Sequence, residues 1–289
     1  MKRGFVVLLL VLLSSGAALS QQAPAAEPKA AEQKPAAETL NLFVDTGGGL
    51  MLPDGEDSTP LYYAAINYAL PAIPEYGVGG QIGGKFTLRD NDPDWLAQAG
   101  LFQRGVDYGF AEGAWSLQGV YQNTWLKADL LSLKPTFGFE LDESNSLAVT
   151  GIWGIREETV GRFAGGKVVQ QTVDTAMLLW GASWNDALRT EVGAGYEFQD
   201  VDSVLLGLHA GYTLNDMTSV ILTYSFDFED NYYAAAGLSF DLGEKGRNAT
   251  FNNISVVGNN AYTPFPLGSL PVMFYETTLG NEPVGAGPS

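Results

Sequence analysis

The sequence predicts an all-β fold, a transmembrane antiparallel up-and-down β-barrel of about 10–12 strands. Three observations lead to this prediction. Apolar residues alternate with small or polar residues along successive segments, which is the period of a strand with two unlike faces. The segments are joined by short connections rich in turn residues. The chain also combines 35 Gly with 13 Tyr, 15 Phe and 6 Trp, as expected for strands that face lipid on one side.

The first 20 residues have the organisation of a secretory signal peptide. Lys2 and Arg3 are basic, residues 5–13 are apolar, and small residues lead to Ser20. We expect cleavage before Gln21 and export of the mature chain. The apolar run is too short to cross a bilayer as a helix, and no later stretch reaches the roughly 20 apolar residues that a spanning helix needs. The sequence therefore excludes a helical membrane protein.

Residues 21–40 read as a flexible periplasmic leader. They are almost entirely Ala, Pro, Glu, Gln and Lys, and such a segment cannot bury enough apolar surface to offset its ordering entropy. A helix is the alternative, since Ala, Glu and Lys favour helices, but the scattered prolines oppose it. The chain has no cysteine, which excludes a lipid-anchored lipoprotein and a disulfide framework.

The clearest strand pattern lies between residues 191 and 242. Four segments there carry apolar side chains at alternate positions, with small or polar side chains between them. Their apolar positions are Val192, Ala194, Tyr196 and Phe198; Val204, Leu206, Leu208, Ala210 and Tyr212; Val220, Leu222, Tyr224 and Phe226; and Ala234, Ala236, Leu238, Phe240 and Leu242. Each segment is about as long as a tilted membrane strand, and the short connections predict consecutive hairpins.

Weaker patterns of the same kind come earlier in the chain. We expect strands at residues 41–52, 61–70, 78–88, 96–105, 114–121, 131–141, 147–155 and 168–184. The total is about twelve, and ten stays open because a pattern sets boundaries only to within a few residues; bacterial barrels favour even numbers. The expected organisation is a signal peptide at 1–20, the leader at 21–40, the barrel at 41–243 and an irregular tail at 244–289.

A soluble β-sandwich is the structural alternative. Sandwiches usually contain long Greek-key crossovers, whereas the hairpins near the end of this chain follow one another directly, and this favours the barrel. With the amino terminus in the periplasm, the odd-numbered connections face outward; residues 54–57, 89–94 and 156–167 make several of them acidic or long. Aromatic rings suited to lipid headgroups lie at expected strand ends, at Trp153, Trp180, Trp184, Tyr212 and Tyr224.

The positions between the apolar ones line the expected lumen. Candidate lumen-facing residues are Gln81, Lys85, Thr87, Glu191, Glu197, His209, Thr223, Ser225, Asp227 and Asp241. Because more of them are acidic than basic, a water-filled passage is expected to favour cations. Inward glycines, among them Gly195 and Gly237, leave two possibilities open: space for a pore, or room for bulky neighbours such as Leu205 and Tyr233.

His209 is the only histidine and is therefore the residue to consider for catalysis, since omptin-type proteases and outer-membrane phospholipases both use one. An omptin-like site needs an Asp partner, but Leu205, Leu206, Gly207 and Leu208 precede His209. A phospholipase-like site needs Ser and His facing lipid, whereas the alternation puts His209 on the lumen side. We expect a hydrogen-bonding lumen residue and no nucleophile with a partnered base.

Metals, cofactors and nucleic acid are not expected as ligands. The run from Asp90 to Asp94 offers oxygen atoms that suit calcium, but it lacks the spacing of a calcium loop, and a solvated acidic turn is favoured. The net charge is −18, and loss of Lys2 and Arg3 with the signal peptide makes the mature chain more acidic. Such a surface repels nucleic acid.

The last expected strand ends in Gly237, Leu238, Ser239, Phe240, Asp241 and Leu242. These residues resemble the carboxy-terminal insertion signal of bacterial outer-membrane proteins, a glycine followed by two alternating apolar or aromatic positions. The resemblance implies outer-membrane lipid and the barrel-insertion machinery as partners. The chain continues to Ser289 instead of ending at an aromatic residue. The sequence therefore does not decide which strand closes the barrel. Residues 79–83 and 99–104 are similar to an uncharacterised group of planctomycete outer-membrane barrels, which implies no activity.

The tail, rich in Asn and Pro, is expected to cross the periplasm, occupy the lumen or add a hairpin. The predicted function is a narrow passive pore for ions or small solutes in the bacterial outer membrane, with cation preference and without catalysis. The alternative is a closed structural or surface-interaction barrel. An enzyme in the barrel rim, inactivated by His209→Ala, is less favoured.

Overall fold

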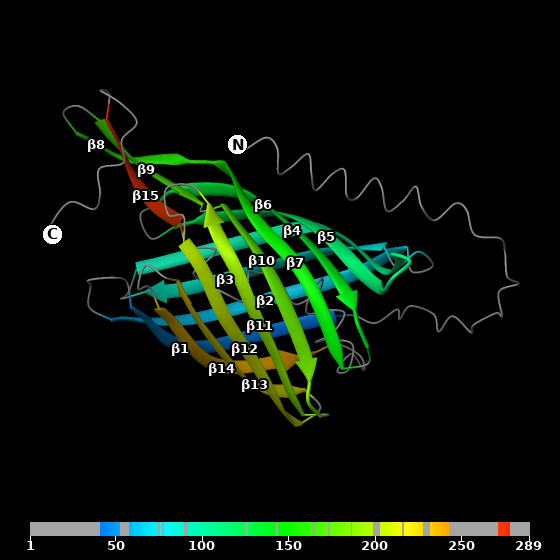
Figure 1. Ribbon diagram of the computed structural model, residues 1–289. Helices are drawn as coiled ribbons and strands as arrows, with labels where there is room; N and C mark the ends of the chain where they lie inside the picture. Colours follow the sequence, from blue (N-terminus) through cyan, green and yellow to red (C-terminus); the bar gives the residue numbers. More distant parts are fainter. Residues whose placement is uncertain are drawn as a thin grey trace, which may run out of the picture.

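The structure is a computed structural model, shown in Figure 1. It describes residues 41–242, except 53–57, 74–75, 77, 90–91, 125–126, 143, 164–165, 173, 186, 199–202, 216 and 228–231, together with residues 271–277. The expected signal peptide, the leader and the tail other than 271–277 lie outside the described residues. Among the residues described, none belongs to a helix long and apolar enough to cross a membrane.

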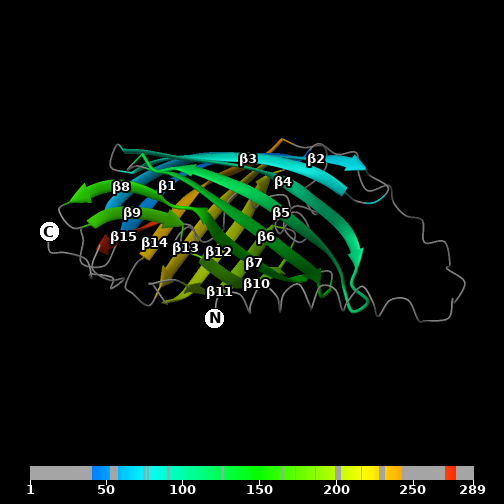
Figure 2. The ribbon, with the colours of Figure 1, turned by 90° about the horizontal axis from the view of Figure 1, so that it is seen from above.

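Twelve strands close into an antiparallel barrel, in the order β1-β14-β13-β12-β11-β10-β7-β6-β5-β4-β3-β2 (Figures 1 and 2). Their bounds are Asn41–Leu52 (β1), Thr59–Ile73 (β2), Val78–Arg89 (β3), Asp92–Asp107 (β4), Glu112–Asn123 (β5), Asp129–Glu140 (β6), Asn145–Arg156 (β7), Asp174–Ser183 (β10), Leu188–Phe198 (β11), Ser203–Asn215 (β12), Thr218–Asp227 (β13) and Tyr232–Asp241 (β14). β14 pairs with β1 and closes the ring. The up-and-down barrel predicted from the sequence is confirmed, with twelve strands.

The alternation in the sequence becomes two different faces in the barrel. In β11, Glu191 and Glu197 are 5% and 3% exposed, whereas Val192 and Tyr196 between them are 45% and 39% exposed. The same contrast recurs along the other strands, with polar side chains buried and large apolar side chains exposed. A protein in water shows the opposite arrangement. The outer face is therefore built for lipid, and a closed barrel leaves no unpaired strand edge within it.

The two ends of the barrel are built differently. We call the end where β1 begins and β14 ends the terminal mouth, and the opposite end the far mouth. Four of the turns at the terminal mouth have an Asp or Asn side chain that accepts the backbone N–H two residues ahead, which stabilises a tight turn. These pairs are Asp107–Gly109 at 2.7 Å, Asp142–Ser144 at 2.8 Å, Asn185–Ala187 at 2.9 Å and Asn215–Met217 at 3.0 Å.

Aromatic side chains gather near both mouths. At the far mouth, the ring centroids of Trp95 and Tyr121 lie 5.0 Å apart, and Phe226 stacks on Tyr232 at 6.2 Å. At the terminal mouth, the Tyr108 and Phe139 rings meet edge to face at 5.1 Å, and Phe110 lies 5.4 Å from Phe139. Two aromatic girdles separated by an apolar band are typical of barrels in a bilayer.

A second sheet continues from the far mouth. Between β7 and β10 the chain forms β8, Glu158–Phe163, and β9, Gly166–Thr172. β9 pairs with β8 on one side and with β15, Pro271–Thr277, on the other (Figure 1). The prediction of one strand over residues 168–184 was wrong, because the alternating pattern runs through two strands that belong to different sheets. The structure also differs from the expectation of irregular backbone at residues 271–277.

Candidate functional site in the barrel interior

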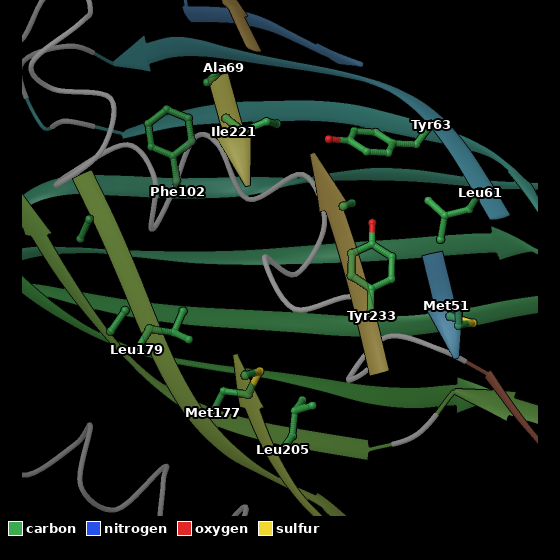
Figure 3. Packing of buried hydrophobic residues seen from close by; sticks show 13 residues of the cluster. Met51, Leu61, Tyr63, Ala69, Phe102, Met177, Leu179, Leu205, Ile221 and Tyr233 are labelled. Atoms are coloured by element: carbon green, nitrogen blue, oxygen red, sulfur yellow. The ribbon is translucent and has the colours of Figure 1, made fainter. Parts of the chain in front are cut away.

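The inner face of the barrel is the candidate site, and part of it is apolar. Figure 3 shows Tyr63 from β2, Phe102 from β4 and Tyr233 from β14 among the buried side chains that point inward. Met177 and Leu205 belong to the same cluster of buried residues. The interior is thus not a uniformly polar channel, since aromatic and aliphatic side chains share it with polar ones.

Tyr63 lies over two inward glycines. Gly47 is the register partner of both Tyr63 on β2 and Gly237 on β14. A Cβ atom added to Gly47 or Gly237 would lie 2.8 Å or 2.7 Å from the Tyr63 hydroxyl oxygen. A Cβ atom on Gly195 would likewise lie 2.6 Å from Cγ of Met177. At these positions the inward glycines make room for large neighbours rather than leaving open space.

Neutral amide side chains cover one wall of the interior. Gln81 on β3, Gly100 on β4, Gln118 on β5 and Lys134 on β6 follow one another as register partners around the barrel. Gln81 and Gln118 are buried, and so is Asn67 on β2, yet within the described part of the chain the side-chain amide atoms of all three have no hydrogen-bond partner. Buried amides normally find a partner in protein or water. This wall therefore offers donors and acceptors to whatever occupies the interior.

A first group of charges lies on β1, β3 and β4. Lys85 interacts electrostatically with Asp94 and Asp45, and its Nζ atom lies 5.2 Å from the centroid of the Tyr63 ring. Both carboxylate oxygens of Asp94 accept a hydrogen bond from Nε2 of Gln122 at 3.2 Å. The charge of Lys85 is therefore balanced by carboxylates on its own side of the barrel.

A second group of charges lies on β6, β11 and β12. Lys134 and Glu191 interact electrostatically although both are buried. Glu191 is also the register partner of His209, which in turn pairs with Thr223 on β13. His209 Nδ1 lies 2.9 Å from Oγ1 of Thr223, within hydrogen-bond distance. The row from Glu191 to Thr223 is a hydrogen-bonding surface on the inner wall.

The candidate residues from the sequence fall on five strands. Gln81, Lys85 and Thr87 occupy alternate positions of β3, and Glu191 and Glu197 do so on β11. The remaining candidates are His209 on β12, Thr223, Ser225 and Asp227 on β13, and Asp241 on β14, which is the register partner of Phe43. Asp227 is placed by its backbone pairing with Leu205. The structure brings Glu191, His209 and Thr223 into one row, whereas Lys85 belongs to the other charge group.

Sequence reasoning missed several residues of this inner face. Asp45, Asn67, Asp94, Gln118 and Lys134 were not among the candidates, although each lies on the buried or partly buried side of its strand. A signal for Lys134 was present. In β6, Ser132, Lys134 and Thr136 alternate with apolar neighbours and are all buried, so the period-two pattern contained this lysine.

No group of three or more potential metal ligands occurs among the described residues. Of the acidic run considered for calcium, positions 90 and 91 lie outside the described residues, and Asp94 turns inward to Gln122. The interior thus presents amides, hydroxyls and paired charges, and these groups bind solutes and ions by hydrogen bonds and electrostatics.

Comparison with known proteins yields similarity of fold. No protein-family model and no curated protein matches the chain. A structure from a study of in-meso crystallization of membrane proteins is similar, with a TM-score of 0.51 at 9% identity, over 81% of this chain and 100% of that chain. The KdgM porin gives 0.44 at 6% identity, over 68% and 98% of the two chains. An outer membrane channel from Pseudomonas putida F1 gives 0.46 at 10%, over 75% and 100%.

Proposed function

We propose that this outer-membrane β-barrel is a narrow passive pore for ions and small solutes, with a preference for cations. The observation that carries the proposal is the charge of the inner face. Among the described inward residues, carboxylates outnumber basic groups. The carboxylates include Asp45, Asp92, Asp94, Glu140, Glu191, Glu197 and Asp241, and the basic groups are Lys85, Arg89, Lys134 and Arg189. Carboxylates that line a passage with low-dielectric walls concentrate cations there.

The preference for cations is expected to be moderate. Lys85 is balanced by Asp45 and Asp94, and Lys134 is balanced by Glu191. Only the inward carboxylates that no basic group balances contribute to the net electric field along the passage. The buried side chains of Gln118 and Lys134 also reach into the interior near the middle of their strands, so a passage beside them is narrow and suits small solutes.

The test is single-channel recording of the mature chain in planar lipid bilayers under a KCl gradient. We expect discrete current steps and a reversal potential closer to the equilibrium potential of K⁺ than to that of Cl⁻. The double variant Asp45→Asn with Glu197→Gln should move the reversal potential toward the equilibrium potential of Cl⁻. Glu157→Gln is the matched control, because this exposed carboxylate lies outside the barrel strands at the far mouth, 3.9 Å from Lys167 Nζ. A reversal potential closer to the equilibrium potential of Cl⁻ than to that of K⁺ would contradict the proposal.

A second candidate is a closed barrel that binds a partner at its far mouth. The sheet formed by β15, β9 and β8 favours it, because this sheet is separate from the barrel sheet and places the exposed ion pair of Lys167 and Glu157 beside the mouth. A folded, inserted barrel that carries no current would support this candidate over the pore.

A further inference from the structure

Two rows of inward residues on β2 to β5 place amide side chains on either side of a glycine. Register partners form both rows, and on β3 and β4 the rows occupy alternate positions, so they lie next to each other on the inner face. The rows are Gln81–Gly100–Gln118 and Asn67–Gly83–Gln98. We call these residues the amide wall, and none of their side chains carries a charge.

Three amides of this wall are buried without a hydrogen-bond partner. Asn67, Gln81 and Gln118 are 4%, 2% and 0% exposed, and an exposed apolar side chain precedes or follows each of them in its strand, so all three point inward. Within the described part of the chain, neither the oxygen nor the nitrogen of these amides has a partner. Buried amides normally have one, so each group has donors and an acceptor free for a solute.

Gly100 brings two of these amides onto one stretch of wall. Gln81 and Gln118 are both register partners of Gly100, and a Cβ atom added to Gly100 would lie 2.9 Å from Cγ of Gln118. The Gln118 side chain therefore leans over the glycine, toward the strand that carries Gln81. The two amides do not bond to each other, so a solute above Gly100 can reach both.

We infer that the amide wall binds uncharged polyhydroxylated solutes, such as monosaccharides. The inference rests on the proposed pore and names a class of solute for it. A hydroxyl group both donates and accepts hydrogen bonds, as a carboxamide does, so adjacent hydroxyls match adjacent amides. An ionic solute matches the wall less well, because the neighbouring charges are already balanced, Lys134 by Glu191 and Lys85 by Asp45 and Asp94.

An apolar surface lies beside the amides. Phe102 is two residues from Gly100 on β4, is buried, and points into the interior (Figure 3). Sites for small uncharged molecules combine aromatic side chains with a few polar groups that orient the ligand. Binding by hydrogen bonds alone, with no ion pair, also stays weak enough for release, which passage through a pore requires.

Saturation-transfer NMR on the folded mature chain tests the inference, with glucose as the probe. Lauryldimethylamine oxide micelles are suitable because this detergent carries no sugar. Triethylene glycol dimethyl ether is the comparison solute, since it is uncharged and only accepts hydrogen bonds. We expect transfer from the protein to glucose and little to the ether. No transfer to glucose, or equal transfer to both solutes, would overturn the inference.

A double variant, Gln81→Leu with Gln118→Leu, removes the two amides beside Gly100. Because these amides have no described partner, the change leaves no other group unpaired, and we expect the variant to fold. The Kd for glucose should rise about tenfold or more, as expected for the loss of two hydrogen bonds. If the double variant does not fold, Asn67→Leu replaces it, with a change in the same direction.

Gln103→Leu is the matched control. Gln103 follows the inward Phe102 and so lies on the outer face of β4, where its Nε2 donates to the carbonyl oxygen of Tyr76 at 3.2 Å and its Oε1 accepts from Nε1 of Trp115 at 3.1 Å. We expect the Kd for glucose to be unchanged in this variant. Equal Kd values for the double variant and the control would overturn the inference.

Swelling of proteoliposomes in isosmotic glucose measures passage separately from binding. A chain that binds glucose through these amides but shows neither swelling nor current would refute the proposed pore and support the assigned ligand. A chain that conducts K⁺ but gives no saturation transfer to glucose would refute the inference and leave the pore standing.

Discussion

Lys134 on β6 and Glu191 on β11 interact across the inside of the barrel with only 1% and 5% of their surfaces exposed. β7 and β10 lie between their strands, so the pair joins separate parts of the wall. Lys134→Met leaves the Glu191 carboxylate buried without its cation, and the free energy of unfolding should fall by about 3–5 kcal/mol. Urea unfolding in detergent micelles, followed by tryptophan fluorescence, measures this change.

Two variants serve as controls for this prediction. Lys167→Met removes an exposed ion pair with Glu157, which should cost only ~0–1 kcal/mol. Glu191→Leu added to Lys134→Met removes both buried charges and should recover much of the lost stability. If Lys134→Met and Lys167→Met lower the free energy of unfolding by the same amount, the buried pair of Lys134 and Glu191 contributes no more to stability than an exposed ion pair.

Gly237→Ala should destabilise the closure between β14 and β1. A Cβ atom at this position would lie 2.3 Å from the carbonyl oxygen of Thr46 and 2.7 Å from the Tyr63 hydroxyl. Overpacking of this kind costs about 1–3 kcal/mol. The matched control is Gly119→Ala, whose Cβ would have its nearest neighbour at 3.9 Å. Samples of each variant are heated to increasing temperatures and run on SDS gels, and the temperature at which the folded band converts to the unfolded band is compared between the two variants. Equal conversion temperatures would refute the close packing at Gly237.

The turn at Asp142 predicts a pH dependence of stability. Its Oδ1 atom accepts the backbone N–H groups of Ser144 and Asn145, both at 2.8 Å, and these hydrogen bonds, together with that from the Asn145 side chain, hold the pKa of Asp142 below its ordinary value. A lowered folded-state pKa stabilises the fold above the unfolded pKa of about 3.9, and this contribution is lost as the pH falls through the lowered pKa. Asp142→Ala should therefore be less stable than the natural chain at pH 7, and the difference should shrink toward pH 2. Urea unfolding at both pH values checks this, and a difference that is the same at both would contradict it.

Opposite changes of selectivity should follow from opposite charge changes on the inner face. Glu197→Gln removes a buried inward carboxylate, and Lys85→Gln removes an inward ammonium group that two carboxylates balance. Glu197→Gln should lower the cation preference and Lys85→Gln should raise it. The reversal potential of each variant under the same salt gradient measures its cation preference. Shifts of the two reversal potentials in the same direction would show that the charges of these residues do not set the selectivity.

The sequence pattern was sufficient for the barrel strands but not for the sheet at the far mouth. β1 was predicted with its observed bounds, Asn41–Leu52, because alternation and flanking turn residues are local signals. The strand expected at 168–184 divides into β9 and β10, since β9 pairs with β15, a segment about 100 residues away. No local pattern reports a partner that distant. For the inner face, the alternation on β11 to β14 placed Glu191 and His209 among the expected lumen residues, whereas the interaction of Lys134 with Glu191 depends on barrel closure and has no local signal.

The current carried by the folded mature chain in a planar bilayer under a KCl gradient decides whether the barrel is a pore. We expect discrete current steps and a reversal potential that shows a preference for K⁺ over Cl⁻, and we expect this preference to be smaller in Glu197→Gln. A barrel that inserts and shows heat-modifiable gel mobility but carries no current, or that prefers Cl⁻, would contradict the proposed pore.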